Sequence, residues 1–326
     1  MTTARKLSAI VAVVLVAIAS VAFLAHRSTE APANPPLAIE QPVTLPFRFV
    51  ALGDTRFTEV KNPEVSNGEI RRAIVQAVAE QKPAFISFGG DIVYRGDKPG
   101  DWSVWDSETA AWRAEKIPVY PALGNHDLHG NERTALSNYF QRFPELQEHR
   151  YYSARIANCL LLVLDSSFDE TSGPQGEWLK QMLDPVPADV AFVLVVLHHP
   201  PYTSSSNAET YGGGHSSRNS EHALARLLEE KQATSRARFV VFAGHVHNYE
   251  RHEHGGVTYF VTGGGGAHPY RIERAPSDPF QSTTVNYHYL LCDVSQESMK
   301  VTMNRVEIVD GKPQWTQPDS VTVTRP

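Results

Sequence analysis

Two histidines separated by one residue, His245 and His247, follow a short apolar segment that ends at Gly244. Residues 238–243 are rich in valine and phenylalanine, which is typical of a buried strand. Side chains two positions apart in an extended backbone point to the same side, and ligands of α/β proteins bind where strands leave the sheet. Neutral imidazole is the commonest protein ligand of metals. Taken alone, the pair is compatible either with metal ligands or with ordinary buried histidines.

Side chains of the same chemical kind follow four other apolar segments. These segments are predicted to be strands, at residues 47–52, 84–88, 119–123 and 191–197. Together with the histidine pair they supply seven candidate metal ligands, which are Asp54, Asp91, Tyr94, Asn125, His198, His245 and His247. Any one of them is compatible with a turn, a cap or a buried polar residue. Five such positions, each after a hydrophobic strand, predict one shared metal site.

The donor atoms of these side chains are oxygen and nitrogen, without sulfur. Such a set suits zinc, manganese or iron, whereas calcium prefers oxygen alone and structural zinc prefers thiolates. Seven ligands exceed the needs of one ion, and two ions roughly 3.5–4 Å apart clamp a phosphoryl group and hold a hydroxide as nucleophile. The two cysteines, Cys159 and Cys292, lie in apolar segments and are interpreted as buried free thiols, with a disulfide as the alternative.

The elements that must position these ligands alternate between strand and helix before giving way to strands alone. Helical spacing is present at residues 68–81, 102–114, 132–141, 175–183 and 220–231, the last with Ser220 as its expected N-cap. A hairpin is expected at residues 151–155 and 159–164, and tail strands at residues 290–294, 300–306 and 320–323. The central strands are nearly continuous Val, Ile, Leu and Phe, so their sheets are buried on both faces. We therefore predict one α/β domain with a β-rich C-terminal tail covering an edge.

The N-terminus is interpreted as a targeting segment. Arg5 and Lys6 precede residues 7–25, which contain no charge. That length fits either a cleaved signal peptide or an uncleaved membrane anchor, and both export the chain to an extracytoplasmic location, which is the periplasm, the cell surface or the medium. We divide the chain into a signal peptide or anchor (residues 1–27), a proline-rich linker (28–46) and a catalytic domain (47–326).

The charge balance bears on possible partners. The formal net charge of −6 does not favour a nucleic-acid partner. An anionic substrate must therefore be attracted by local positive charge, such as metal ions. The sequence does not fix an oligomeric state.

Five short motifs, in order, carry a resemblance to a known family. They are GD at residues 53–54, GDxxY at 90–94, GNHD at 124–127, HxPxY at 198–202 and GHxHxYER at 244–251. This series resembles the calcineurin-like metallophosphoesterases, and specifically their purple acid phosphatase branch, over residues 47–262. The resemblance implies two packed mixed β-sheets flanked by helices, a four-layer sandwich, with a dinuclear metal site at the strand ends.

The resemblance also implies a ligand set for each metal ion. The first ion would be held by Asp54, Asp91, Tyr94 and His247, and the second by Asp91, Asn125, His198 and His245. Asp91 would bridge the two, and His198 is favoured over the adjacent His199 by its spacing to the proline and tyrosine of the motif.

One departure from the family pattern concerns the first ion. Many relatives carry D-x-H in the first motif, where this chain has Arg56. Tyr94 can replace the missing ligand, as in the purple acid phosphatases, and a hard phenolate favours Fe(III) beside a divalent Fe, Zn or Mn. The alternative is that Tyr94 only packs in its loop, in which case zinc or manganese is favoured.

Three further residues are candidates for contact with the substrate. His126 would contact phosphate or protonate the leaving oxygen. His215 lies on a loop where relatives carry substrate-facing histidines. Arg56 would bind a phosphate oxygen or, alternatively, pair with a neighbouring carboxylate. The remaining residues of the last motif are expected to orient ligands from behind; they are Tyr249, Glu250 and Arg251.

The predicted function is hydrolysis of phosphate monoesters, with a hydroxide held by the metal pair attacking phosphorus in line. The nearest alternative is a phosphodiesterase of the same superfamily, acting on a cyclic nucleotide, a nucleotide or a phospholipid headgroup. Two further alternatives are a hydrolase of another bond, such as a pyrophosphate, and a non-catalytic domain that kept the fold. The expected partner is a small-molecule phosphate ester, with membrane attachment through residues 7–25 if these are not cleaved.

Overall fold

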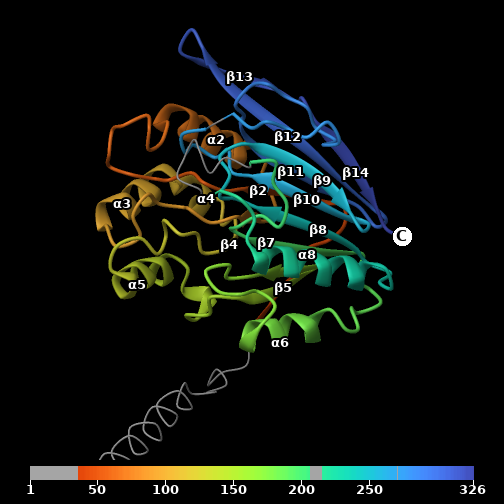
Figure 1. Ribbon diagram of the computed structural model, residues 1–326. Helices are drawn as coiled ribbons and strands as arrows, with labels where there is room; N and C mark the ends of the chain where they lie inside the picture. The colour runs from red at the N-terminus through yellow and green to blue at the C-terminus, as the bar shows by residue number, and fades with distance from the viewer. Residues whose placement is uncertain (1–35, 206–214, 270) are drawn as a thin grey trace, which may run out of the picture. The chain divides into compact units, whose positions relative to one another are not determined.

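Two mixed β-sheets organise the chain from Pro36 to Pro326 in the computed structural model, which describes residues 36–205, 215–269 and 271–326. Helices flank the sheets, with α6 and α8 on the side of the molecule opposite α2 (Figure 1). The predicted pair of helix-flanked mixed sheets is therefore confirmed.

The first sheet has seven strands and supplies the histidines. Its order is β1 (Leu37–Gln41), β5 (Tyr152–Ile156), β6 (Cys159–Val163), β7 (Phe192–Leu197), β8 (Arg238–Ala243), β10 (Val257–Thr262) and β9 (Tyr249–His254). The neighbours β6, β7, β8 and β10 run parallel. Their carboxyl ends therefore meet at one edge of the sheet. The predicted hairpin is present as the antiparallel pair β5 and β6.

The second sheet also has seven strands and supplies the acidic ligands. Its order is β13 (Lys312–Thr316), β12 (Ser298–Val309), β11 (Tyr287–Val294), β2 (Phe47–Leu52), β3 (Ile86–Phe88) and β4 (Val119–Pro121), with β14 (Ser320–Thr324) also paired to β12. The strands β2, β3 and β4 are parallel. The tail is antiparallel, as expected, and β11 pairs with β2. It thus extends the second sheet, with β13 as an additional strand.

Burial on both faces is visible along β7. Phe192, Leu194 and Val196 belong to the core between the sheets, whereas Val193, Val195 and Leu197 belong to a second core. That second core also includes Trp178 and Leu179 of α6 (Gly173–Met182) and Leu224 and Leu228 of α8 (Asn219–Gln232). Alternate residues of one strand thus face different layers, which is why the strand is apolar throughout.

The remaining helices pack on the second sheet and its loops. They are α2 (Gly68–Glu80), α3 (Pro99–Glu108), α4 (Ala110–Ala114), α5 (Glu132–Arg142) and the short 3-10 helix η1 (Pro144–Leu146). Ile70, Ile74, Val75 and Val78 form the buried apolar stripe of α2.

Three expectations from the sequence are wrong in detail. Within the expected linker, Leu37–Gln41 forms β1, which pairs in parallel with β5. The helix expected at residues 102–114 is divided at Thr109, whose hydroxyl bonds the Trp105 carbonyl at 2.6 Å. The N-cap of α8 is Arg218 rather than Ser220, because the Glu221 side chain bonds back to the Arg218 backbone N–H at 2.7 Å.

The structure describes the two cysteines but not the N-terminal segment. Cys159 and Cys292 are buried free thiols, as interpreted, and burial raises the pKa of the Cys159 thiol to about 12. The segment at residues 7–25 lies outside the described residues. Among the residues that are described, no helix has the length and apolar character needed to cross a membrane.

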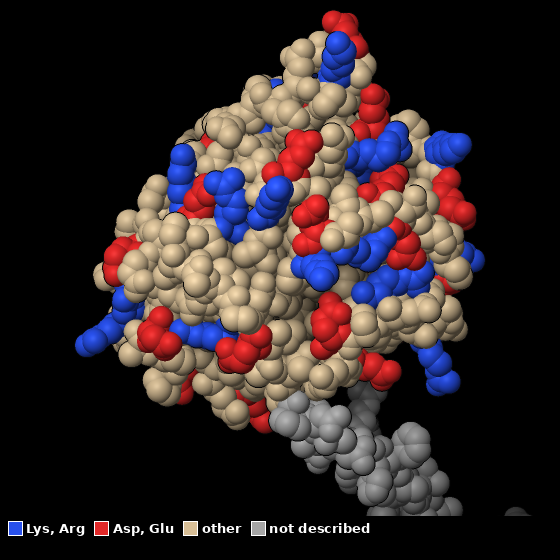
Figure 2. Space-filling model, turned by 180° about the vertical axis from the view of Figure 1, so that it is seen from behind, with Lys and Arg blue, Asp and Glu red and all other residues tan. Residues whose placement is uncertain are grey.

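On the face shown in Figure 2, Lys and Arg side chains are interspersed with Asp and Glu.

Phe49 of β2 joins the two sheets through aromatic contacts. Its fully buried ring stacks on Phe85 at 4.6 Å and meets the edge of Phe242 from β8 at 5.8 Å. A Phe49→Ala variant is expected to lose about 3–5 kcal/mol of unfolding free energy, because it leaves a cavity between the sheets. Urea unfolding measures this loss. Val309→Ala, at a position 38% exposed, serves as control and should stay within about 0.5 kcal/mol of the parent.

Candidate metal centre

The carboxyl ends of strands from both sheets meet at the candidate site. The backbone N–H of His245, which follows β8, donates to Asp54 Oδ2 at 2.9 Å. His198 follows β7, and its Nδ1 bonds the Gly89 carbonyl after β3 at 2.8 Å. These bonds join the histidine-bearing edge of the first sheet to the acidic edge of the second.

A first cluster consists of Asp54, Asp91 and His247. One donor atom from each lies within 4.8 Å of the others, and all three side chains are buried. Asp54 Oδ1 is 3.5 Å from His247 Nε2 and, although fully enclosed, accepts no hydrogen bond. The Nδ1 of His247 bonds the His268 carbonyl at 2.7 Å. That bond uses the ring N–H, so the lone pair is on Nε2 and faces Asp54.

A second cluster surrounds the Nε2 atom of His198. Asn125 Oδ1 lies 3.0 Å away, Asp91 Oδ1 3.4 Å and His245 Nδ1 3.2 Å. Because Nδ1 of His198 donates to the Gly89 carbonyl, its Nε2 presents a lone pair to the oxygens of Asn125 and Asp91. A cation at this point would turn repulsion between lone pairs into attraction. Asp91 belongs to both clusters, as a bridging carboxylate must.

The electrostatics of the clusters also fit cations. Burial raises the pKa of Asp54, and the nearby Asp91 raises it further. Burial opposes ionisation of Asp91 as well, but His198, His126 and Arg56 together hold its pKa below the ordinary value. Burial lowers the pKa of His198 and of His247. The imidazoles are therefore neutral near pH 7, the form that ligates metals.

Close backbone packing brings the ligands together. Asp54, Asp91 and His245 have positive φ angles of 57°, 52° and 70°, a region that residues other than glycine rarely adopt and that is enriched at functional sites. A Cβ on Gly244 would lie 2.5 Å from Asp54 Oδ2, and one on Gly124 would lie 2.3 Å from Asp91 Oδ1. Both positions therefore require glycine.

Tyr94 and His126 lie together beside the clusters. Their rings stack with centroids 5.3 Å apart, and His126 Nδ1 bonds the Tyr94 carbonyl at 2.7 Å. The backbone N–H of His126 donates to Asp91 Oδ1 at 2.8 Å. His126 is thus fixed next to the shared carboxylate. Burial lowers the pKa of its ring.

Arg56 and His215 also reach the centre. The guanidinium of Arg56 bonds Asp91 Oδ2 at 3.3 and 3.4 Å, which is the salt-bridge alternative anticipated for it. The His215 ring lies 4.9 Å from the ring of His245 and 6.0 Å from that of His247. Both side chains are therefore near the clusters.

Two residues near the centre were missed from the sequence. The hydroxyl of Ser166 bonds His199 Nδ1 at 2.9 Å, and His199 groups with His198 and His245. Asp127 receives the backbone N–H groups of Gly124 and Val93 at 2.9 and 3.2 Å and holds the turn that carries Asn125. Ser166 follows β6 just as Asp54 follows β2, which is the signal that could have identified it.

The last three residues of the GHxHxYER motif support the site without facing it. Glu250 accepts bonds from the Thr203 hydroxyl and the Ser204 backbone N–H, at 2.6 and 2.7 Å. Tyr249 and Arg251 both bond Asp319 in the tail, at 2.7 and 2.9 Å. The motif thus ties a loop and the C-terminal tail to the strand that follows the histidines.

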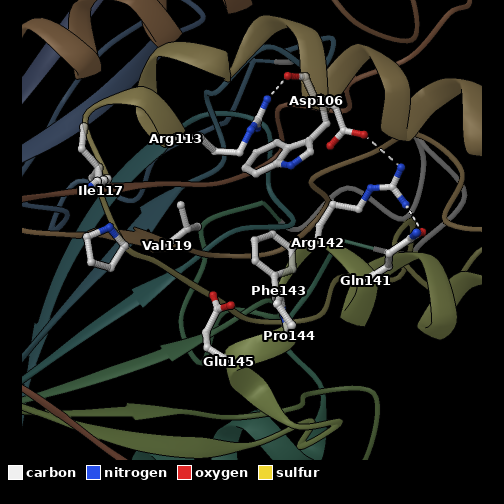
Figure 3. Close-up of a pocket in the computed structure, with 12 residues that line it drawn as sticks. Asp106, Arg113, Ile117, Val119, Gln141, Arg142, Phe143, Pro144 and Glu145 are labelled. Atoms are coloured by element: carbon white, nitrogen blue, oxygen red, sulfur yellow. Dashed lines mark hydrogen bonds and ion pairs between the residues drawn. The ribbon is translucent and has the colours of Figure 1, made fainter.

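A separate cavity of about 600 Å³ lies between α3, α4, β4 and α5. Its two arginines are already paired, since Arg113 bonds the Asp106 carbonyl and Arg142 bonds the Asp106 carboxylate at 3.0 Å (Figure 3). None of the residues lining it is a candidate ligand. The candidate ligands lie instead at the strand ends.

Comparison with known proteins agrees with this geometry. A family model described as calcineurin-like phosphoesterase matches residues 47–249. Purple acid phosphatase 5 of Arabidopsis thaliana is 28% identical over 240 residues, which cover 71% of this chain and 51% of that protein. Fe(3+)-Zn(2+) purple acid phosphatase 12 of the same plant is 26% identical over 278 residues, covering 80% and 55%. The chain thus spans about half the length of these curated relatives.

A solved structure has the same fold. Purple acid phosphatase PPD1 from yellow lupin (Lupinus luteus) seeds matches 86% of this chain and 54% of its own, with a TM-score of 0.64 at 20% identity. The resemblance to the purple acid phosphatase branch, inferred from the five motifs, is confirmed.

Proposed function

Because the chain belongs to the calcineurin-like phosphoesterase family, we propose that it hydrolyses phosphate monoesters at a dinuclear metal centre. The observation that carries this proposal is the sharing of Asp91 between the two ligand clusters. A single-ion site would need no such carboxylate. The names of the plant relatives support a phosphatase of the purple acid type.

The proposed ligands are those of the two clusters, with Tyr94 added to the first. One ion would be held by Asp54, Asp91, Tyr94 and His247, and the other by Asp91, Asn125, His198 and His245. The donors fit, because His198 and His247 offer Nε2 lone pairs and Asp54 Oδ1 is buried without a hydrogen bond. When bound, such ions polarise phosphoryl oxygens and make a bound water more acidic.

Three further polar side chains would contact the substrate. With Nδ1 of His126 engaged by the Tyr94 carbonyl, Nε2 is the nitrogen that would meet a phosphate oxygen or the leaving group. His215, close to His245 and His247, would assist departure of the alcohol. Arg56 would exchange part of its contact with Asp91 for a phosphate oxygen, since guanidinium binds oxyanions in a bidentate manner.

The choice of substrate is tested by comparing the hydrolysis of a phosphate monoester and of the corresponding diester by the metal-loaded protein. We expect kcat/KM for phenyl phosphate to exceed that for diphenyl phosphate. A strong preference for the diester would favour the phosphodiesterase alternative, and turnover of pyrophosphate alone would favour a hydrolase of that bond. Absence of any turnover with both ions bound would favour a non-catalytic domain.

The identity of the first metal is tested through Tyr94. We propose Fe(III) at this position beside a divalent Fe, Zn or Mn, so the oxidised, iron-loaded protein should show a broad visible charge-transfer band. A Tyr94→Phe variant should lose this band. Tyr202→Phe is the control, because the Tyr202 hydroxyl bonds Glu229 at 2.8 Å, and it should keep the band. A band that persists in Tyr94→Phe would remove Tyr94 from the ligand set.

We also propose that the catalytic domain is exported by its N-terminal segment, as a secreted or surface-anchored protein. The support is the basic pair before the uncharged residues 7–25. N-terminal sequencing of protein from the native host separates a cleaved signal from an anchor. Recovery of the intact chain from the cytoplasm alone would contradict export.

A further inference from the structure

An exposed phenylalanine lies on the loop between β6 and α6. Phe168 is 57% exposed, the most exposed large hydrophobic side chain in the part of the chain that the structure describes. Ser166 before it and Glu170 after it are fully buried, whereas residues 167–169 are exposed. The loop is therefore fixed at both ends and presents Phe168 at its centre. Isolated exposed hydrophobic residues are common, but this one is distinguished by its neighbours.

The loop leaves the sheet at the edge that carries the metal centre. β6 and β7 are parallel neighbours, so the residues after both strands emerge side by side. Ser166, two positions before Phe168, bonds both the ring and the backbone N–H of His199, at 2.9 and 3.1 Å. The ring of His199 lies 4.4 Å from that of His245. Phe168 is therefore two residues from a side chain that contacts a histidine beside the centre.

One face of the Phe168 ring is covered by an arginine. The guanidinium of Arg150 lies 4.7 Å from the ring centroid. Three acceptors hold it there, namely Asp165 at 2.6 Å, Glu132 at 3.0 Å and the Ser167 hydroxyl at 3.0 Å. Arg150 covers part of the ring, and the residue remains 57% exposed, so much of the ring is available to a ligand.

We propose that Phe168, backed by Arg150, is a stacking platform for a planar aromatic group on the substrate. On a loop that leaves the sheet beside the centre, it would meet the leaving group of an ester whose phosphate lies at the metal pair. An open aromatic face binds a second ring by offset or edge contact. The proposal rests on the proposed function and narrows its substrate class to aromatic phosphate esters.

Binding of two non-hydrolysable probes tests the platform without turnover. Titration calorimetry on the metal-loaded protein should give a Kd for phenylphosphonate roughly fivefold lower than for methylphosphonate, a ratio expected of one aromatic contact. Phe168→Ala should remove this preference by weakening phenylphosphonate alone, and Phe168→Trp should retain it. Trp315→Ala, at an exposed aromatic of the tail that is 37% exposed, is the matched control and should keep the parent ratio.

Three binding results would contradict the proposed role of Phe168. They are equal affinity for the two phosphonates in the parent protein, a preference that survives in Phe168→Ala, or binding of neither probe. Turnover distinguishes this inference from the proposed function: if the phosphonate preference depends on Phe168 but no monoester is hydrolysed, the platform stands and the phosphatase assignment fails. If hydrolysis occurs, kcat/KM for phenyl phosphate and for a nucleoside monophosphate, each against glycerol phosphate, shows which aromatic source is preferred.

Discussion

An Asp91→Asn variant is expected to lose about a thousandfold in kcat for phenyl phosphate and to retain fewer than two metal ions. Asp91 is the carboxylate common to both clusters, 3.4 Å from His198 Nε2 and grouped with Asp54 and His247. An amide offers one neutral oxygen in place of two charged ones and therefore cannot bridge. Stabilisation by a metal ion is worth several kcal/mol, and about 1.4 kcal/mol corresponds to a tenfold change in rate. Steady-state kinetics and metal analysis of the same preparation measure both effects.

Asp319→Asn is the matched control for this experiment. Asp319 is also a largely buried carboxylate, with 11% side-chain exposure, but it bonds Tyr249 and Arg251 in the tail. This variant should keep both ions and the parent kcat, with a loss of about 1–3 kcal/mol in unfolding free energy. If Asp91→Asn instead retained two ions and full turnover, a centre built on a shared carboxylate would be wrong.

A Gly124→Ala variant is expected to lower kcat by about a hundredfold, although Gly124 is not itself a ligand. Its new Cβ would lie 2.2 Å from the Asp91 backbone nitrogen and 2.3 Å from Asp91 Oδ1. The shared carboxylate must then move, and a displacement of about 1 Å in a catalytic site can cost a hundredfold. Kinetics with metal analysis measures the effect.

Gly68→Ala provides the comparison for this second prediction. At Gly68 the nearest atom to an added Cβ is Arg72 Nη1 at 3.2 Å, the end of a flexible and exposed side chain. Alanine is also favoured over glycine in a helix, so activity should be unchanged. Equal activity of Gly124→Ala and the parent would show that the tight contact with Asp91 is not needed.

Much of the candidate site follows from local sequence patterns. Residues 192–197 are apolar at every position because alternate side chains face different cores, and such a run identifies a doubly buried strand without knowledge of its partners. The polar residues just after such runs, including Asp54, Asp91 and His198, lie where strands of both sheets end. Strand length and the alternation of side chains are properties of a few neighbouring residues, so sequence alone determines them.

Tertiary structure decided the remaining features, because they depend on pairings between distant segments. Leu37–Gln41 forms a strand because β5 provides an edge for it, although the neighbouring prolines favoured a linker. Arg56 pairs with Asp91, 35 residues away, and its own neighbours do not reveal that choice. Phe168 is a candidate contact for the substrate only because Arg150 and His199 lie near its loop. The sequence thus determined which residues end the strands, while long-range pairing decided which of those ends meet.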